Sequence, residues 1–342
     1  NLFFEKTQPL VPGTLRFGVT ERMTASGKAH TPLSEARVRQ VIRKISAANV
    51  QAIAVCLLHA YANPAHEKAL GRLLRKAFPK HFITLSHEIL REYREYERTS
   101  TTVLNAYVGL EVSQYLKALE EPLRQQSFQG KFMIMQSNGG VMSAKRAAHI
   151  PVGMMESGPA GGIIGAGMLG QLLNEPDVIA FDMGGTTAKT CLVEKGMPKM
   201  TDQYFIGGYQ HGHPMRLPVV DIIEVGAGGG SMAWIDEGGS LKVGPRSAGS
   251  TPGPACYGRG GTEPTVTDAN LVTGRLNPHR FLGGEFDLDL KLATQAIEQR
   301  IAKPLGLSVM DAALGILRIA DAKMSFAVRA ITMQRGYDPR KF

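Results

Sequence analysis

The sequence contains few cysteines and no long apolar run. Each absence excludes a class of protein. Its three cysteines, Cys56, Cys191 and Cys256, are odd in number and far apart. This excludes a disulfide-stapled scaffold and favours buried thiols in the reducing cytoplasm. No run of about 18 apolar residues is present, so we expect no membrane-spanning helix and no membrane partner. The opening Asn1-Leu2-Phe3-Phe4 lacks a methionine and a signal-peptide pattern, which suggests a processed product or a fragment.

Common nucleotide-binding motifs are also missing. A P-loop requires Gly-Lys-Ser or Gly-Lys-Thr at the start of a helix, and the sequence has neither. The nearest approach to a dinucleotide fingerprint, Gly153 to Gly167, does not follow a convincing strand.

The net charge of +9 suits an anionic substrate, a nucleotide or an acidic partner subunit. Lysine and arginine are nevertheless scattered without a recognised nucleic-acid motif, so we expect no nucleic-acid binding.

What is present is an ordinary globular composition, with 43% apolar and 20% charged residues in a chain of 342, long enough for two or more domains. The apolar segment Val50–Leu58 predicts a strand between two amphipathic helices, Glu35–Ser46 and Ala65–Ala77, which form an α-β-α unit. Further predicted elements are a solvated charged helix over 91–98, a long helix over about 100–123, a strand over 132–135, a small-residue helix over 157–173 packed close to another backbone, loops over 226–261 and helices over 288–335.

One stretch carries most of the chemical information. It reads Val178-Ile179-Ala180-Phe181-Asp182-Met183-Gly184-Gly185-Thr186-Thr187 and is followed by the apolar run Thr190–Val193. We predict two paired strands joined by a polar turn. The glycines allow backbone N–H groups to approach an anion, and the threonines add hydroxyl donors. Asp182 at the strand end can orient a hydrated divalent cation or a water, so the set suits the terminal phosphates of a nucleotide.

An ordinary hairpin turn explains the same residues, because glycine also supplies the positive φ that such turns need. From these residues alone, a phosphate site and a plain turn stay equally open. The same two interpretations apply to a second polar turn, Gln136-Ser137-Asn138-Gly139-Gly140. There, Ser137 and Asn138 either face a ligand or form the turn.

Two further candidates are weaker. Cys256 lies in a glycine-rich, loop-like context where a nucleophile is conceivable, but a packed thiol is favoured because no positioned histidine base is evident. His211 and His213 would share one face of a strand and can bind a metal, but exposed loop histidines are favoured.

Several segments together resemble the hydantoinase A/5-oxoprolinase family, within the superfamily of actin, sugar kinases and heat-shock-chaperone ATPases. They are Tyr96–Tyr107, Met135–Gly140, Glu156–Gly162, Phe181–Thr187, Gly226–Ser231, Gly244–Gly249, Pro252–Gly261 and Pro264–Asn270. The resemblance implies an α/β fold of actin-like ATPase (ribonuclease H-like) domains with mixed sheets flanked by helices. It places the remainder of an N-terminal domain in residues 1–100 and a hydantoinase A domain in residues 101–342.

The resemblance also implies a function: ATP-dependent opening of a cyclic amide (a hydantoin, 5-oxoproline or another lactam) by carbonyl phosphorylation and hydrolysis. The implied cofactors are ATP and Mg²⁺, and the implied partner is a hydantoinase B-like subunit or domain. Acetone and acetophenone carboxylases share the architecture, so a nucleotide-binding carboxylase subunit is an alternative. A non-catalytic module in which nucleotide state switches a partner surface is another.

The implied site residues follow the motifs. Asp182 is expected to be catalytic and to hold Mg²⁺, with Asp268 as a weaker catalytic candidate and Arg246 as a candidate for the site wall. The residues expected to bind phosphate or to lie near the nucleotide are Gly184, Gly185, Thr186, Thr187, Gly228, Gly229, Gly230 and Ser231.

The chain departs from the family pattern in three ways. The family continues its phosphate motif as Thr-Ser-Thr-Asp, whereas this chain reads Thr186-Thr187-Ala188-Lys189, which replaces the acidic residue by lysine and suggests a subgroup with its own substrate. The family's first phosphate loop is absent. The adenosine loop expected just beyond 336–339 is missing as well. We therefore expect an internal fragment that binds ATP poorly and is inactive in isolation.

Overall fold

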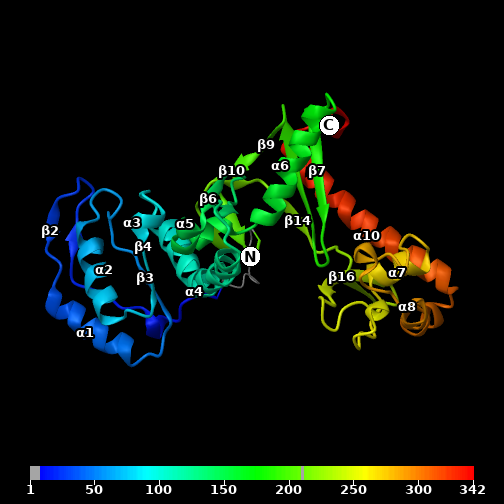
Figure 1. Cartoon of the computed structure of the whole chain (residues 1–342), viewed down its shortest axis with the longest axis horizontal. Helices are drawn as coiled ribbons and strands as arrows, with labels where there is room; N and C mark the ends of the chain where they lie inside the picture. Colours follow the sequence, from blue (N-terminus) through cyan, green and yellow to red (C-terminus); the bar gives the residue numbers. More distant parts are fainter. Residues whose placement is uncertain (1–7, 209–211) are drawn as a thin grey trace. The chain divides into compact units, whose positions relative to one another are not determined.

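The computed structural model describes residues 8–208 and 212–342 (Figure 1). The chain divides into two compact units. Unit 1 contains the described residues up to Gly161 together with Met200–Val220, and unit 2 contains Gly162–Lys199 and Asp221–Phe342. This division follows compactness, whereas the expected division at residue 100 follows family motifs and stays a prediction.

The first part of unit 1 is a parallel strand pair covered by helices (Figure 1). Helices α1 (Glu35–Ser46) and α2 (Ala65–Ala77) have the predicted bounds. The Ser34 hydroxyl caps α1 by accepting a hydrogen bond from a backbone N–H, which fixes where the helix begins. Strand β3 (Ala52–Val55) is shorter than predicted because its parallel partner β4 (Phe82–Leu85) pairs with only these residues.

The charged segment before the long helix differs from its prediction. Helix α4 (Glu95–Gln125) takes in the second half of the segment, and Arg98 is fully buried instead of solvated. Its guanidinium donates to the Ser86 hydroxyl at 2.5 Å and lies 3.9 Å from the buried Glu67 carboxylate. Glu67 comes from another helix, so a local charge pattern could not reveal this pairing.

Unit 1 contains further short elements. Antiparallel pairs form between β1 and β2, β5 and β6, β10 and β13, and β11 and β12. The bounds are η1 Gly13–Leu15, β1 Arg22–Met23, β2 Ala29–Thr31, α3 Ser86–Ile89, β5 Met133–Met135, β6 Val141–Ser143, α5 Ala144–His149, η2 Pro151–Met154, β10 Met200–Thr201, β11 Tyr204–Ile206, β12 His213–Met215 and β13 Val219–Val220.

Unit 2 is built on an antiparallel sheet in the order β14-β8-β7, with β9 also paired to β8. Its strands are β7 Val178–Met183, β8 Ala188–Glu194, β9 Met197–Pro198 and β14 Ile223–Val225. Mixed α/β structure is confirmed. Over the described ranges, however, parallel and antiparallel pairs occupy separate sheets, which corrects the expectation of mixed sheets.

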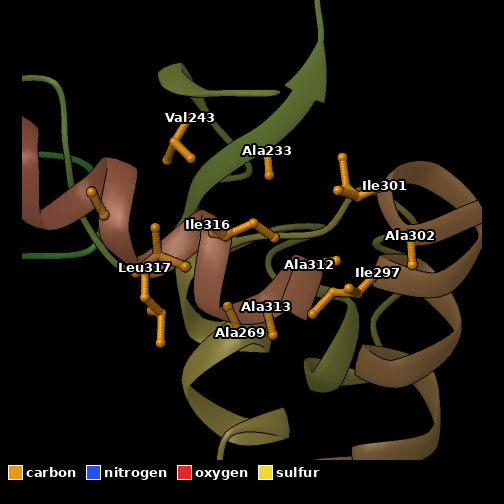
Figure 2. Packing of buried hydrophobic residues seen from close by; sticks show 12 residues of the cluster. Ala233, Val243, Ala269, Ile297, Ile301, Ala302, Ala312, Ala313, Ile316 and Leu317 are labelled. Atoms are coloured by element: carbon orange, nitrogen blue, oxygen red, sulfur yellow. The ribbon is translucent and has the colours of Figure 1, made fainter. Parts of the chain in front are cut away.

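The main core of unit 2 lies between a second hairpin and three helices. Figure 2 shows Ala233 and Val243 of the hairpin and Ala269, Ile316 and Ile297 of the helices directed into one interior. The elements are β15 Ser231–Ile235, β16 Leu241–Ser247, α7 Val266–Val272, α8 Leu290–Ile297 and α10 Val309–Ile331, with shorter turns η3 Ala255–Tyr257, η4 Leu282–Gly284, η5 Glu298–Ala302, α9 Lys303–Leu305, η6 Met333–Arg335 and η7 Pro339–Lys341.

The small-residue helix α6 (Ser157–Leu172) contains the boundary between the two units. The expected close approach to another backbone occurs at Gly167, where an added Cβ would lie 3.0 Å from the Gly196 carbonyl oxygen. Gly162 and Gly165 instead have open space beside them. Within the described ranges, no helix combines the length and apolar character needed to cross a membrane.

Candidate functional site

The stretch singled out in the sequence forms the predicted hairpin of β7 and β8. Asp182 pairs in register with Lys189, so both side chains lie on one face of the sheet. Asp182 is exposed one residue before the end of β7. The connecting turn, residues 184–187, is closed by a hydrogen bond from the Gly184 N–H to the Thr187 carbonyl oxygen at 2.9 Å.

This turn leaves backbone donors without protein acceptors. Across residues 8–208 and 212–342, the N–H groups of Gly185, Thr186 and Thr187 make no backbone or side-chain hydrogen bond. Gly185 and Thr186 are exposed and Thr187 is half-buried. Successive unpaired N–H groups in a turn form a concave arrangement suited to an anion.

The predicted glycine-rich loop holds this turn from the protein side. The Gly229 N–H donates to the Gly184 carbonyl oxygen at 3.0 Å, and the Gly230 N–H donates to the Gly185 carbonyl oxygen at 2.6 Å. The two loops are therefore brought together. However, these two N–H groups are already used by the protein, so they support the turn and are not free to bind a phosphate.

The close contact requires glycine at position 228. An added Cβ there would lie 2.7 Å from the Thr186 nitrogen and 2.8 Å from the Gly184 carbonyl oxygen, both rigid backbone atoms. The Gly228 N–H donates to the hydroxyl of the fully buried Ser231 at 2.9 Å. Ser231 thus shapes the loop from inside the protein.

Two residues that the sequence interpretation missed complete the support. The Thr267 N–H and hydroxyl both donate to the Gly229 carbonyl oxygen at 2.8 Å. The Ser247 and Thr186 hydroxyls lie 3.5 Å apart. Both residues lie in segments that resemble the hydantoinase A family, and this resemblance was the only sequence signal for a role at the site. Their contact with the turn is visible only in the fold.

Lys189 lies beside the turn with a defined set of partners. Its ammonium donates to the Thr187 hydroxyl at 2.9 Å and to the Glu224 carboxylate at 3.0 Å. Glu224 pairs with Lys189 in the ladder, so Asp182, Lys189 and Glu224 form a row of alternating charge across three strands. The lysine side chain is only 16% exposed, which keeps its charge close to the turn.

Asp268 has a different environment from Asp182. It is fully buried, and its carboxylate accepts hydrogen bonds from the N–H groups of Ala255, Cys256 and Thr265 and from the Thr265 hydroxyl, at 2.8–3.2 Å. With Thr265 it forms the capping box of α7. This is the environment of a structural carboxylate, so a catalytic role for Asp268 gains no support from its geometry.

Two of the three cysteines, Cys191 and Cys256, are buried. Burial, followed by the negative charge of Asp268, raises the pKa of the Cys256 thiol far above its usual value. Burial also raises the pKa of Cys191 to about 11. Because the thiolate is the reactive form, these positions favour packed thiols over nucleophiles.

The polar turn of unit 1 resolves into turn-forming contacts. Ser137 is buried, and its N–H and hydroxyl both donate to the Gly153 carbonyl oxygen, at 2.8 and 2.9 Å. The Asn138 side chain accepts from the Gly140 N–H at 2.9 Å. Both residues also line a cavity of about 200 Å³.

The remaining candidates are less informative. Arg246 is exposed on β16. His211 lies outside the described residues, while His213 is in β12. The described part of the chain contains no cluster of three or more His, Cys, Asp or Glu side chains that could hold a metal ion, so a metal at Asp182 would need ligands from the nucleotide or water.

Comparisons with known proteins identify relatives of this chain. The family described as Hydantoinase/oxoprolinase matches residues 98–342, and the Hydantoinase/oxoprolinase N-terminal region matches residues 1–78. An uncharacterized protein of Methanocaldococcus jannaschii is 44% identical over 350 residues, covering 100% of this chain and 51% of that protein. Caprolactamase subunit alpha of Pseudomonas jessenii is 38% identical over 333 residues, covering 97% of this chain and 47% of that protein.

Two solved structures are also similar. A nucleotide-free acetone carboxylase, from a study of ATP-dependent acetone carboxylation, superposes with a TM-score of 0.86 at 33% identity, covering 98% of this chain and 47% of that chain. The ATP-dependent caprolactamase from Pseudomonas jessenii superposes with a TM-score of 0.74 at 35% identity, covering 100% of this chain and 49% of that chain. This chain thus spans about half the length of the curated relatives it matches. From its motifs, its turn-and-loop geometry and these matches, we conclude that the chain belongs to the hydantoinase/oxoprolinase family.

Proposed function

We propose that the protein carrying this chain uses ATP to phosphorylate the carbonyl oxygen of a cyclic amide and then hydrolyses the activated ring. The observation that carries this proposal is the 184–187 turn, which presents three unpaired backbone N–H groups beside the exposed Asp182. The names of the relatives, a caprolactamase and an ATP-dependent carboxylase, support ATP as the phosphoryl donor. We also propose that the two units represent actin-like ATPase domains.

In this proposal the turn binds the terminal phosphates of ATP. The N–H groups of Gly185, Thr186 and Thr187 donate to phosphate oxygens, and the Thr186 hydroxyl adds a further donor. Because the loop at 228–230 already fixes the turn, little reorganisation is needed when charge develops on the transferring group. Phosphoryl transfer depends mainly on such positioning and charge stabilisation.

The donor set also fits Mg²⁺. Mg²⁺ bound with ATP is typically held by one or two carboxylates together with phosphate oxygens and water, and Asp182 is an exposed carboxylate beside the proposed phosphate site. Asp182 would hold the ion, and the ion would supply neutralisation of phosphate charge. Lys189, through its hydrogen bond to the Thr187 hydroxyl, orients that hydroxyl and adds positive charge near the same site.

The proposed reaction balances with one ATP and two water molecules. The amide oxygen attacks the terminal phosphorus, the bond to the bridging oxygen breaks, and ADP leaves. Water then adds to the activated carbon and the ring C–N bond breaks, which gives an acyl phosphate and a free amine. A second water releases phosphate and leaves the carboxylate. Coupling to ATP supplies the driving force that opening an unstrained lactam lacks.

A second candidate reaction is carboxylation of a ketone through its enol phosphate. The observation that favours it is the TM-score of 0.86 with acetone carboxylase. Both candidates use the same phosphate site and differ in the molecule that accepts the phosphoryl group.

Since the matched relatives include a protein named as a subunit, we propose a partner subunit or domain of the hydantoinase B type. The three unpaired cysteines agree with a reducing, cytoplasmic location.

The test is Asp182→Asn in the full-length protein with its partner, measured as ADP release with a panel of lactams and with ketone plus bicarbonate. We expect substrate-dependent ADP release to fall about 100-fold or more, as for loss of a group that stabilises transition-state charge. Asp236→Asn is the matched control, because Asp236 lies in the turn of the β15–β16 hairpin of unit 2 and binds only local groups.

Unchanged ADP release in Asp182→Asn would remove the proposed role of this residue. Lactam stimulation of ADP release favours the amidase, and stimulation by ketone plus bicarbonate favours the carboxylase. Stimulation by a protein partner alone would instead favour the nucleotide-switched module.

A further inference from the structure

Unit 1 contains a second polar site that the proposed phosphoryl transfer does not use. It is an open cavity of about 540 Å³ between α2, α3, the residues that follow α3, and α5. That volume is within the range typical of small-ligand sites. The polar residues that line it are Lys68, His87, Glu88, Arg91, Arg146 and His149.

Most of the positive charge in this cavity is not paired with an acidic side chain. Lys68 and Arg146 are exposed, and their side chains make no hydrogen bond or ion pair to any residue within 8–208 or 212–342. Arg91 uses one nitrogen, Nε, to donate to the His87 carbonyl oxygen at 3.2 Å. The rest of its guanidinium fork has no such contact among the described residues. Three cationic groups with free donors therefore converge on one cavity.

The one acidic side chain in the lining is already neutralised. Glu88 lies 3.2 Å from the Arg75 guanidinium and 3.4 Å from His149 Nε2. Burial alone would raise the pKa of Glu88, but the hydrogen bond from His149 and the charge of Arg75 outweigh it and hold the pKa below its usual value. Glu88 thus stays ionised and paired, and it leaves the charge of Lys68, Arg91 and Arg146 in excess.

His87 gives the cavity a rigid wall. Its side chain is only 3% exposed, and its Nδ1 lies 2.7 Å from the Glu67 carboxylate. Glu67 is itself fully buried and accepts hydrogen bonds from the Leu57 N–H at 2.8 Å and from the Ser86 hydroxyl at 2.6 Å. No residue in the described part of the chain hydrogen-bonds to the other ring nitrogen of His87, Nε2. The imidazole is therefore held in one orientation by Glu67.

We propose that this cavity binds the oxyanion group of a small organic ligand, a phosphoryl or carboxylate group. An arginine fork matches two oxygens of either group, and charge-assisted hydrogen bonds of this kind are stronger than neutral ones. The lysine adds a point charge, and the His87 ring forms a rigid wall of the site. The volume exceeds what a lone phosphate needs, so the ligand carries an organic body. The proposal rests on unit 1 alone and stands or falls independently of the ATP site in unit 2.

The test follows Lys68 directly, in the full-length protein with its partner. The amines are acetylated with a limiting reagent, and labelling of the Lys68 peptide is quantified by mass spectrometry over a range of inorganic phosphate or, separately, succinate. Sodium chloride at equal ionic strength is the reference, and Lys117 on α4, exposed in the same unit, is the internal control. Because the readout is residue-specific, phosphate bound at the turn of unit 2 does not interfere.

We expect saturable protection of Lys68 and none of Lys117, and the anion that protects at lower concentration identifies the ligand group. Arg146→Gln should raise the half-protecting concentration about tenfold, the effect of losing one charge-assisted hydrogen bond. Arg124→Gln, at an exposed arginine of α4 in the same unit, should leave that concentration unchanged.

Three results would overturn the proposal. The first is protection by neither anion beyond that by chloride. The second is an equal response of Arg146→Gln and Arg124→Gln, which would indicate general charge effects. The third is a Lys68 that is unlabelled in the assembled protein without any added anion, which would show that a protein surface covers the cavity.

Discussion

The turn at residues 136–140 in unit 1 and the turn at residues 184–187 in unit 2 both join antiparallel strands and both contain a Gly-Gly pair. In the first, the N–H groups of Gln136, Ser137, Gly139 and Gly140 all donate to protein acceptors. In the second, three successive N–H groups find no acceptor within the described residues.

The two turns differ in whether their backbone N–H groups are already bound by protein acceptors, and we propose that this difference decides which turn binds an anion. Sequence letters alone gave both turns the same two interpretations. A turn whose donors are consumed internally is a structural connection, whereas one whose carbonyl oxygens are held from behind and whose donors stay free is prepared for a ligand. The loop at 228–230 creates that difference, because it binds the carbonyl oxygens of Gly184 and Gly185.

The largest effect is expected when the support of the 184–187 turn by the 228–230 loop is disturbed. Gly228→Ala places a Cβ against backbone atoms of Thr186 and Gly184, so the turn must move. We expect substrate-dependent ADP release to fall about 100-fold, since a displacement of about 1 Å can cost that much. Steady-state ADP release by the full-length protein measures the effect.

The matched variant in the other turn is Gly140→Ala. Its Cβ would meet the side chains of Asn138 and Gln136 at 3.1 and 3.6 Å. Because those groups can move aside, a much smaller effect is expected. Equal losses in the two variants, or full activity in a folded Gly228→Ala protein, would show that the support of the turn does not matter.

A smaller effect is expected from Lys189→Ala. This change removes the hydrogen bond to the Thr187 hydroxyl and leaves the Glu224 carboxylate unpaired near the proposed phosphate site. We expect the KM for ATP to rise about tenfold, the effect of one charge-assisted hydrogen bond. Lys242→Ala is the control, because that lysine pairs with Asp236 in the β15–β16 hairpin of unit 2.

The lysine at position 189 would also fit a weakened ATPase, and the reverse exchange tests this explanation. Lys189→Asp restores the acidic residue of the family pattern. If this variant turned over ATP faster than the native protein, Lys189 would mark a weakened ATPase and the nucleotide-switched module would gain support.

The smallest effect concerns stability. Ser137→Ala removes a buried hydroxyl that donates to the Gly153 carbonyl oxygen and should lower the free energy of unfolding by about 1 kcal/mol. Thr186→Ala, at an exposed position, should stay within about 0.5 kcal/mol. Urea titration compares the two midpoints. If Thr186→Ala lowered the free energy of unfolding more than Ser137→Ala, the 184–187 turn and not the 136–140 turn would have the structural role.

Much of the fold was predictable because its signals are local. The bounds of α1 and α2 follow from apolar periodicity and, for α1, the Ser34 cap. The hairpin of β7 and β8 follows from two apolar runs around a polar turn. The length of strand β3 was overestimated, because its partner β4 pairs with only part of the apolar run.

The parts that resisted prediction depend on contacts between distant segments. The burial of Arg98 depends on Glu67 of another helix, and the capping role of Asp268 depends on N–H groups of a separate loop. Asp182 and Asp268 are the same residue type in the sequence, but Asp182 is exposed, whereas Asp268 is buried and accepts hydrogen bonds from several donors. Only the fold distinguishes a carboxylate free for chemistry from one committed to structure.

The 184–187 turn is anchored by main-chain hydrogen bonds alone from the 228–230 loop. Peptide groups do not titrate, so the contribution of these backbone N–H groups to anion binding should not change with pH while the protein stays folded. Side chains at 182, 187 and 189 can therefore be exchanged to alter the chemistry while the peptide cradle remains in place. Variation in substrate among proteins built on this scaffold would then require no redesign of the backbone that we propose binds the phosphate.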